Sequence, residues 1–146
     1  MRKDAAGSAS VKARKRVLIV EDDSDLRSML QEFLITEGYE CLDAEDGVEA
    51  LDWLSQVPVA LVVVDILMPR MAGHELIRKM RDTRAWATIP ILLLSGYGDL
   101  APYRDLPVNG IQLKPFTLPD FLAKVREIIA EVVNDCETPG PGQRRS

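Results

Sequence analysis

The chain has 146 residues, of which 47% are hydrophobic, and it carries a formal net charge of −5. This length accommodates one domain with a single buried core and leaves no room for a second folded domain. Residues 1–16 hold six basic side chains and one acidic, whereas residues 17–133 hold ten basic and twenty acidic. Because nucleic-acid binding requires clustered Lys and Arg, the acidic 17–133 segment argues against a nucleic-acid-binding core.

The cysteines and the first apolar run indicate a cytoplasmic chain. Cys41 and Cys136 have no metal-ligand or redox spacing, which is usual in a reducing intracellular compartment. The first apolar run, 17–20, is too short for a signal-peptide core or a membrane span. We therefore expect no membrane association, and we expect the basic residues 1–16 to form a solvated, disordered tail.

The first half of the chain alternates predicted strands and helices. Unbroken apolar runs suit parallel strands that are covered on both faces, and the first such run is 17–20. An apolar stripe at helical spacing follows and ends before Gly38, a natural C-cap. The members of this stripe are Leu26, Met29, Leu30, Phe33 and Leu34. A weaker strand at 40–44 and a helix that begins at Asp46 and ends before Pro58 come next.

The second half continues the alternation. Apolar runs at 60–64 and 91–94 predict a third and a fourth strand, and 110–113 is a weaker fifth. Between the third and fourth strands, a helix places Leu76, Ile77 and Met80 on one face. A last helix opens at Thr117 with a capping box. Strands that alternate with helices imply right-handed crossovers and a doubly wound parallel sheet, with ligands at the carboxyl ends of the strands.

Two segments break the regular pattern. The connection at 96–109 contains two prolines, so the fourth helix is expected to be short or irregular. Residues 134–146 are rich in Pro and Gly and are expected to form a disordered tail. We therefore expect one folded domain at 17–133 between the two tails.

Polar and charged residues stand at the carboxyl ends of the predicted strands. Glu21 and Asp22 follow the first strand, Asp65 the third, Ser95 the fourth and Lys114 the fifth. Three carboxylates at close range repel one another unless a cation is present, and all-oxygen ligation suits Mg2+. With Asp65 as a phosphoryl acceptor, Lys114 would supply positive charge and Ser95 a hydrogen bond to phosphate oxygen. The set predicts a site for Mg2+ and phosphate.

Together these residues resemble the receiver domain of two-component response regulators, over roughly residues 16–133. Asp65 lies in the motif Val-Val-Asp-Ile-Leu-Met-Pro, and Lys114 precedes a proline. The separations are 43 residues from Asp22 to Asp65, 30 to Ser95 and 19 more to Lys114. Each motif alone is common, but the set at these separations is specific. The resemblance implies a flavodoxin-like α/β fold whose five-stranded parallel sheet has the order 2-1-3-4-5.

The resemblance also implies how the site works. A histidine kinase or histidine phosphotransfer protein would phosphorylate Asp65 in a phosphorelay, and phosphorylation would switch the binding of an output protein. Mg2+ would be the cofactor, and its implied ligands are Glu21, Asp22, Asp65 and the carbonyl of Leu67. Ser95 and Lys114 match the family's hydroxyl and lysine, and the Lys114–Pro115 bond is expected to be cis. Such a domain is a regulatory phosphoacceptor and not an enzyme.

Four features depart from the family pattern. Ile111 stands where receivers usually have a switch aromatic, and Ser95 stands where Thr is common. The connection between the fourth and fifth strands is short and bears prolines. Leu67 and Tyr97, two residues beyond the acceptor and the hydroxyl, are bulky, and we expect them to obstruct attacking water and lengthen the phosphoryl lifetime.

Two alternatives come from other classes. A haloacid-dehalogenase-like phosphatase also uses an aspartyl phosphate and Mg2+, but it requires a second acid where this chain has Leu67. Ile111 and the shortened fourth helix favour a receiver-like adaptor that is never phosphorylated, whereas the intact acidic pair, Asp65, Ser95 and Lys114 count against it. The residues suit both a stand-alone receiver and a receiver from a hybrid kinase or larger regulator. His74, the only histidine, is interpreted as a surface residue at the start of the third helix.

Overall fold

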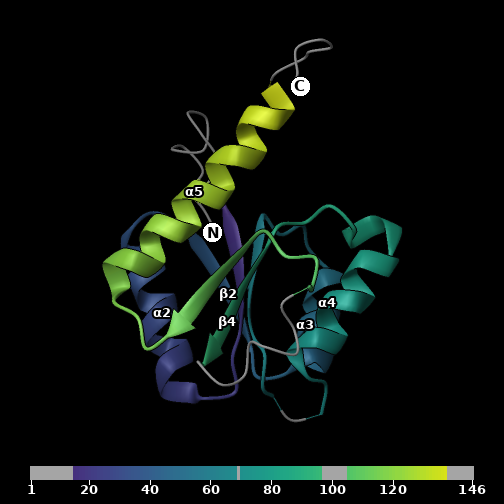
Figure 1. Ribbon diagram of the computed structural model, residues 1–146, viewed down its shortest axis with the longest axis horizontal. Helices are drawn as coiled ribbons and strands as arrows, with labels where there is room; N and C mark the ends of the chain where they lie inside the picture. The colour runs from purple at the N-terminus through teal and green to yellow at the C-terminus, as the bar shows by residue number, and fades with distance from the viewer. Residues whose placement is uncertain (1–14, 69, 97–104, 138–146) are drawn as a thin grey trace.

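Five parallel strands form one sheet in the order β2-β1-β3-β4-β5 (Figure 1). This computed structural model describes residues 15–68, 70–96 and 105–137. The strands are β1 Arg16–Val20, β2 Glu40–Ala44, β3 Leu61–Asp65, β4 Ile91–Gly96 and β5 Gly110–Lys114. The predicted strands and their order are therefore confirmed.

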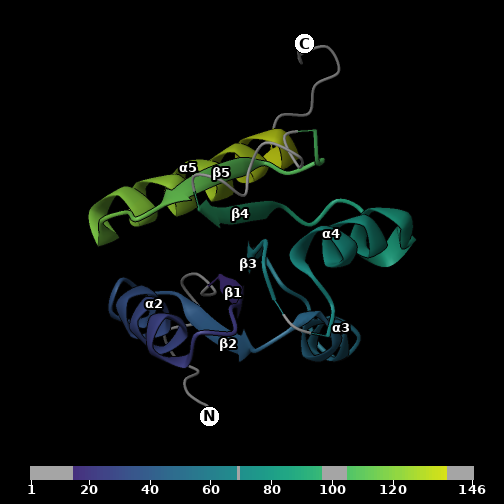
Figure 2. The same ribbon diagram turned by 60° about the horizontal axis from the view of Figure 1, so that its bottom comes forward.

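Helices cover both faces of the sheet (Figure 2). In the described ranges, α2 and α5 pack on one face, and α3 and α4 pack on the other. Their bounds are α2 Ser24–Thr36, α3 Gly47–Leu54, α4 Gly73–Asp82 and α5 Leu118–Glu137, and a short 3-10 helix η1, Arg84–Trp86, follows α4. The result is a three-layered, doubly wound α/β fold.

Each central strand supplies side chains to two cores. Successive residues of a strand point to opposite faces, so Val17 and Ile19 pack with α2 and α5, whereas Leu18 and Val20 pack with α3 and α4. All five residues of β3 are buried. Because both faces are covered, the sequence of these strands is continuously apolar and does not alternate.

Local signals begin α2 and α3, and those at Gly38 and Asp46 lie where the sequence predicts. Asp23 caps α2, because its Oδ1 accepts hydrogen bonds from two backbone N–H groups of the first turn at 3.0 and 3.2 Å. Gly38 follows this helix with φ of 101°, a left-handed conformation that favours glycine. Asp46 caps α3, and its Oδ1 accepts from the Glu49 N–H at 2.9 Å.

Two helices differ in detail from the prediction. The apolar stripe of α2 is narrower than expected, because Met29 is 47% exposed while the other members are buried or half-buried. α5 continues to Glu137, past the predicted domain boundary at 133, since neither Gly nor Pro interrupts it before Pro139. The first four residues of the predicted 134–146 tail are thus helical. No helix in the described ranges, α5 included, is long and apolar enough to cross a membrane.

The connection between β4 and β5 is described only in its second part. Residues 97–104, which include most of the expected short fourth helix, lie outside the described residues. Residues 105–109 form turns and bends without a helix. Within them Leu106 is buried in the core that α3 and α4 share, so this end of the connection packs onto the sheet.

Leu34 and Ile35 offer a matched test of the α2 packing, because they are adjacent on one helix and differ in burial. Leu34 is fully buried, and Ile35 is 48% exposed. We expect Leu34→Ala to lower the free energy of unfolding by about 2–5 kcal/mol, through lost apolar contact and a cavity. Ile35→Ala should change it by about 0.5 kcal/mol or less. Urea unfolding followed by circular dichroism measures both, and equal losses would contradict the packing described for α2.

Candidate functional site

Acidic side chains from β1 and β3 meet at the carboxyl edge of the sheet. The two strands are neighbours, with Val20 paired to Val64, so the residues that follow them lie side by side. Carboxylate oxygens of Glu21, Asp22 and Asp65 all lie within 4.8 Å of one another. Glu21 is 1% exposed and Asp65 6% exposed, whereas Asp22 is open to solvent. The structure therefore brings together the three acids that the sequence singled out.

Lys114 reaches this acidic cluster (Glu21, Asp22 and Asp65) across the strand β4. It ends β5, and β4 lies between β5 and β3. Its Nζ lies 3.2 Å from Asp65 Oδ1 and 3.3 Å from Glu21 Oε1. The Lys114–Pro115 bond is cis, as the resemblance implied. One ammonium group thus contacts two buried carboxylates.

Ser95 lies on β4, the strand that Lys114 crosses. It is fully buried. It follows Leu94, which pairs with Asp65 of β3, and it precedes Gly96, the last residue of β4. The Ser95 hydroxyl donates to the Gly96 carbonyl at 3.1 Å. The hydroxyl is thus satisfied by its own strand in this state, and a phosphate would have to compete for it.

Leu67 stands just outside the cluster. It lies two residues beyond the end of β3, and its side chain is 54% exposed. That its backbone carbonyl binds Mg2+ stays a prediction. Tyr97, its expected counterpart beyond β4, lies outside the described residues.

The electrostatics of the cluster favour a bound cation. Burial, and then the charge of Asp65, raise the pKa of Glu21 to about 7. Burial also raises the pKa of Asp65, although Lys114 acts against it. For Lys114 burial alone would lower the pKa, but the two adjacent carboxylates outweigh it and raise the pKa. A single lysine therefore does not neutralise three carboxylates.

The donor set fits Mg2+. Glu21, Asp22 and Asp65 offer only oxygen, and Mg2+ binds through one or two carboxylates while it keeps several waters. Asp22 is exposed, so water can reach the site. These three residues would hold the ion, which would supply positive charge where the ammonium of Lys114 falls short.

Sequence reasoning missed Arg27, which supports the first acidic loop. This α2 side chain donates from Nη1 to the Glu21 carbonyl at 2.6 Å and from Nε to Asp43 Oδ2 at 3.2 Å. The Asp23 N–H also donates to Glu21 Oε2 at 3.2 Å. Arg27 thus ties the loop to β2. Its place on the helix gave no signal for this role, because the contact depends on how α2 lies on the sheet.

A second missed residue is Gly73, at the start of α4. A Cβ atom there would lie 2.3 Å from the Asp65 backbone oxygen and 2.8 Å from the Ile66 Cα. The Gly73 N–H also donates to the Ile66 carbonyl at 3.0 Å. The helix therefore approaches the backbone of Asp65 more closely than any residue with a side chain allows.

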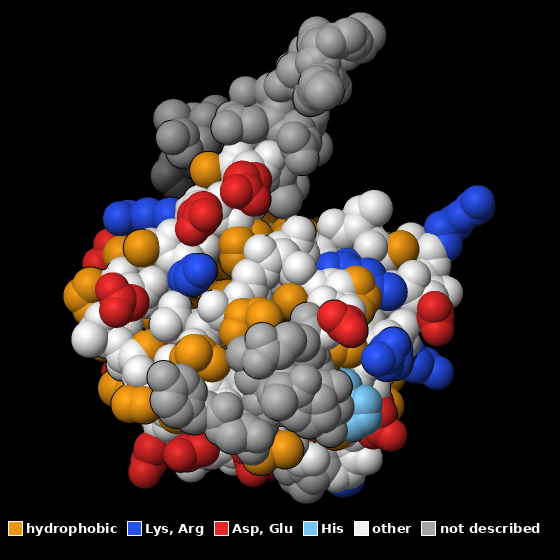
Figure 3. All heavy atoms as spheres, in the orientation of Figure 1, with side chains coloured by type: hydrophobic (Ala, Val, Ile, Leu, Met, Phe, Trp, Pro, Cys, Tyr) orange, Lys and Arg blue, Asp and Glu red, His pale blue; other side chains and the backbone are white. Residues whose placement is uncertain are grey.

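Two further residues were singled out in the sequence. Ile111, at the position of the switch aromatic, is partly buried and packs against the core under α3 and α4. His74 is the second residue of α4 and is half-buried. Figure 3 shows Lys and Arg side chains gathered over α4, with Asp and Glu beside them, and side chains of both charges over α5.

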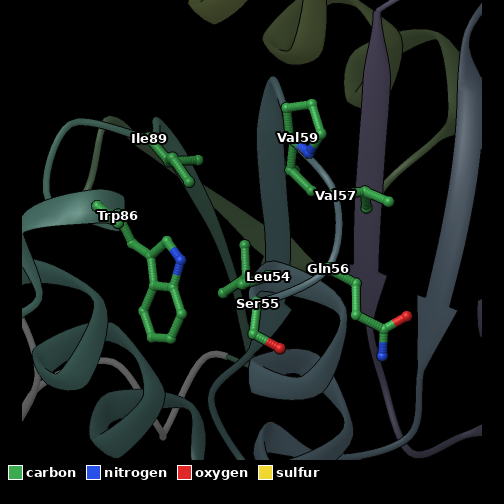
Figure 4. Close-up of a pocket in the computed structure, with 9 residues that line it drawn as sticks. Leu54, Ser55, Gln56, Val57, Val59, Trp86 and Ile89 are labelled. Carbon is green, nitrogen blue, oxygen red and sulfur yellow. The ribbon is translucent and has the colours of Figure 1, made fainter.

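An apolar hollow of about 280 Å³ opens at the opposite edge of the sheet (Figure 4). It lies where β3 and β4 begin, and Trp86, Leu54 and Ile89 line much of it. None of the residues that line it is titratable. The hollow therefore has no groups for acid–base or metal chemistry, in contrast to the acidic cluster.

The fold and the acidic edge agree with a comparison to known families. The sequence matches the response regulator receiver domain family over residues 17–126. This chain belongs to that family, the phosphoaccepting receivers of two-component systems.

Two relatives illustrate the contexts in which this domain occurs. The chain is 36% identical over 118 residues to the sensor histidine kinase TmoS of Ectopseudomonas mendocina, and the aligned region covers 79% of this chain and 12% of the kinase. It is 34% identical over 123 residues to the response regulator MprA of Mycobacterium sp. strain KMS, and the aligned region covers 82% of this chain and 53% of the regulator. The chain thus spans about half the length of the regulator and a small part of the kinase.

Solved structures show the same fold. A CheY-like receiver domain protein from Methanospirillum hungatei has a TM-score of 0.78 at 28% identity, over 84% of this chain and 99% of that one. The chemotaxis response regulator CheY4 of Vibrio cholerae has a TM-score of 0.74 at 27% identity, over 80% and 99%. The flavodoxin-like architecture expected from the sequence is confirmed.

Family membership decides between the receiver and the phosphatase considered above. Receiver domains are regulatory phosphoacceptors that histidine kinases phosphorylate, and they are not catalytic enzymes. The phosphatase alternative is therefore excluded. The acidic cluster is typical of the Mg2+ site of receivers.

Asp22 allows a direct test of metal binding, because it is the exposed member of the cluster. We expect MgCl2 to raise the melting temperature of the chain, since a ligand at a hundredfold excess over its Kd stabilises the native state by about 2.7 kcal/mol. Asp22→Ala should remove most of this shift, and EDTA should reverse it. Asp82→Ala, which removes an exposed acid at the end of α4, should leave it unchanged. An equal shift in all three proteins, measured by thermal unfolding, would argue against the site.

Proposed function

We propose that Asp65 of this chain accepts a phosphoryl group from a histidine kinase or histidine phosphotransfer protein, with Mg2+ held by Glu21, Asp22, Asp65 and the Leu67 carbonyl. The observation that carries the proposal is the contact of Lys114 Nζ with Asp65 Oδ1, at 3.2 Å, inside the acidic cluster. Bound Mg2+ would offset the negative charge of the incoming group.

The transfer needs little from the chain beyond position and charge. A carboxylate oxygen of Asp65 forms the new bond to phosphorus as the bond from phosphorus to the donor histidine nitrogen breaks. Asp65 is nearly buried at the end of a strand that is fully buried, so its position is fixed. Lys114 already contacts the carboxylate and places an ammonium group beside the developing charge.

The product can drive a change of state through two contacts. Phosphorylation adds charge and acceptor oxygens, so Lys114 can exchange a carboxylate for a phosphoryl oxygen, and the Ser95 hydroxyl can turn from the Gly96 carbonyl to the same group. Each charge-assisted hydrogen bond contributes about 1.5–3 kcal/mol. Inverting a 1:99 equilibrium requires about 5.5 kcal/mol, so these two contacts supply most of a switch if they form only in the active state.

The partners are proposed from chemistry and context. The donor is a phosphohistidine protein, and the output partner is a protein that binds the phosphorylated face. TmoS is a sensor histidine kinase and MprA a response regulator, so the domain occurs in both kinds of protein. We propose that the folded unit that receives the signal in this cytoplasmic pathway is the predicted 17–133 domain, extended by Arg16, which is the first residue of β1, and by the last turn of α5.

One observation favours a second candidate, an adaptor that works without phosphorylation. Position 111 holds Ile, which is partly buried against the core under α3 and α4, so no aromatic side chain can change rotamer there. An adaptor would bind its partner equally well with and without a phosphodonor. The intact set of Asp65, Ser95 and Lys114 favours the phosphoacceptor.

Phosphoryl acceptance can be tested by intact-mass analysis after incubation with acetyl phosphate and MgCl2. We expect one phosphoryl adduct on the native chain and none on Asp65→Asn. Asp82→Asn, in an exposed acid far from the cluster, should still form the adduct. No adduct on a native chain that is folded and binds Mg2+ would support the adaptor instead.

Leu67 can be tested as a shield of the acyl phosphate. Its large side chain stands two residues beyond Asp65, and we expect it to obstruct attacking water. Leu67→Gly should therefore shorten the half-life of the phosphorylated chain by about three- to tenfold. Met29→Ala, which removes another exposed apolar side chain, is the control. The decay is followed by mass spectrometry after the phosphodonor is removed, and an unchanged half-life would reject the shielding role.

A further inference from the structure

Arg70 lies in the connection between β3 and α4, five residues beyond Asp65, and it holds an unusual backbone conformation. Its φ is 50°, and among the described residues it is the one non-glycine residue with positive φ. A side chain is disfavoured there, so surrounding contacts must hold the residue in place. The contacts that do so come from α3.

The main contact is an ion pair with the buried cap of α3. Arg70 Nε and Nη2 both lie 2.5 Å from Asp46 Oδ2. The other oxygen, Oδ1, accepts from the Glu49 N–H and caps the helix. Asp46 is only 2% exposed, and in the described part of the chain Arg70 is its one ion-pair partner. Although burial opposes the charged form, the cap and then Arg70 hold the pKa of Asp46 below its usual value.

The next residue adds a second contact between the connection and α3. A Cβ atom on Gly47 would lie 2.7–2.8 Å from side-chain atoms of Met71, so Met71 rests directly on the first turn of α3. At its far end the connection is held by Gly73, whose N–H donates to the Ile66 carbonyl. Figure 2 shows α3 and α4 side by side on this face of the sheet. The connection is thus fixed at both ends.

We propose that the Arg70–Asp46 ion pair positions the β3–α4 connection and thereby sets the affinity of the acidic cluster for Mg2+. The inference rests on the proposed function, because the connection carries Leu67, whose carbonyl is a proposed ligand. Neither Arg70 nor Asp46 has an ion pair with Asp65 among the described residues. Both are positioning residues, which act through the backbone that they hold.

The variants separate the ion pair from the other roles of its members. Asp46→Asn keeps an oxygen that can cap α3 but removes the charge, since Asn is as good a cap as Asp. Arg70→Gly removes the guanidinium and also relieves the positive φ, so its fold is not at risk. Arg70→Lys keeps a positive charge and is the conservative rescue. Arg78→Ala, in an exposed arginine of α4, controls for loss of positive charge.

The first measurement is the Kd for Mg2+ by isothermal titration calorimetry. We expect Asp46→Asn and Arg70→Gly each to weaken binding by about three- to tenfold, and the double variant to be no weaker than the singles. Arg70→Lys should recover most of the affinity, and Arg78→Ala should match the native chain. Unchanged affinity in the folded variants would overturn the proposal, and so would an equal loss in Arg78→Ala.

The second measurement needs no metal. In EDTA, we expect the Gly73 amide to exchange its hydrogen faster in Asp46→Asn and Arg70→Gly than in the native chain, as followed by NMR. Unchanged exchange would show that the ion pair does not hold the connection, and would overturn the proposal. If the native chain itself bound no Mg2+, the proposed function would fail first, and the link to affinity would fall with it. Faster exchange in that case would support only the first part of the proposal, that the ion pair positions the connection.

Discussion

The structure depends on a charge imbalance at one edge of the sheet. Three carboxylates share a few ångströms with one ammonium group, and two of the carboxylates are almost fully buried. Burial raises the pKa of both buried acids, so the charged forms of these carboxylates are disfavoured at this edge of the sheet. Such a site gains stability from any added cation and is then able to take up a group as negative as a phosphoryl.

The rest of the fold keeps the three carboxylates and the ammonium group close together. Buried apolar strands carry the acids to the edge, and helices on both faces keep the strands from moving apart. Arg27 contacts the loop after β1, Gly73 lets α4 start against the backbone of Asp65, and Arg70 ties the connection after β3 to α3. A folded state in which like charges repel requires this kind of support from the surrounding packing.

Local patterns predicted the strands and placed acidic residues at their ends, whereas the order of the strands came from the resemblance to receiver domains. Apolar runs that are covered on both faces give a clear signal, and Glu21, Asp22 and Asp65 stand at the ends of such runs, whereas Lys114 ends the weaker edge strand β5. The sequence did not predict Arg27 or the Arg70–Asp46 pair, since these contacts join segments 16 and 24 residues apart through helix packing. It also placed Met29 in the core and ended α5 too early, because the periodicity of a stripe fixes neither its width nor its length.

The position of β5 at the edge of the sheet links the acidic cluster to the surface of the molecule. β5 is an edge strand with one neighbour, and all five of its residues are only partly buried, whereas those of β3 are fully buried. The side-chain oxygen of Gln112 in β5 is buried without a hydrogen-bond partner, the one such side-chain atom in the described ranges. Lys114 therefore contacts Asp65 from an edge strand of the sheet. A pull on its ammonium group would act on a strand with a single neighbour and not on the buried centre of the sheet.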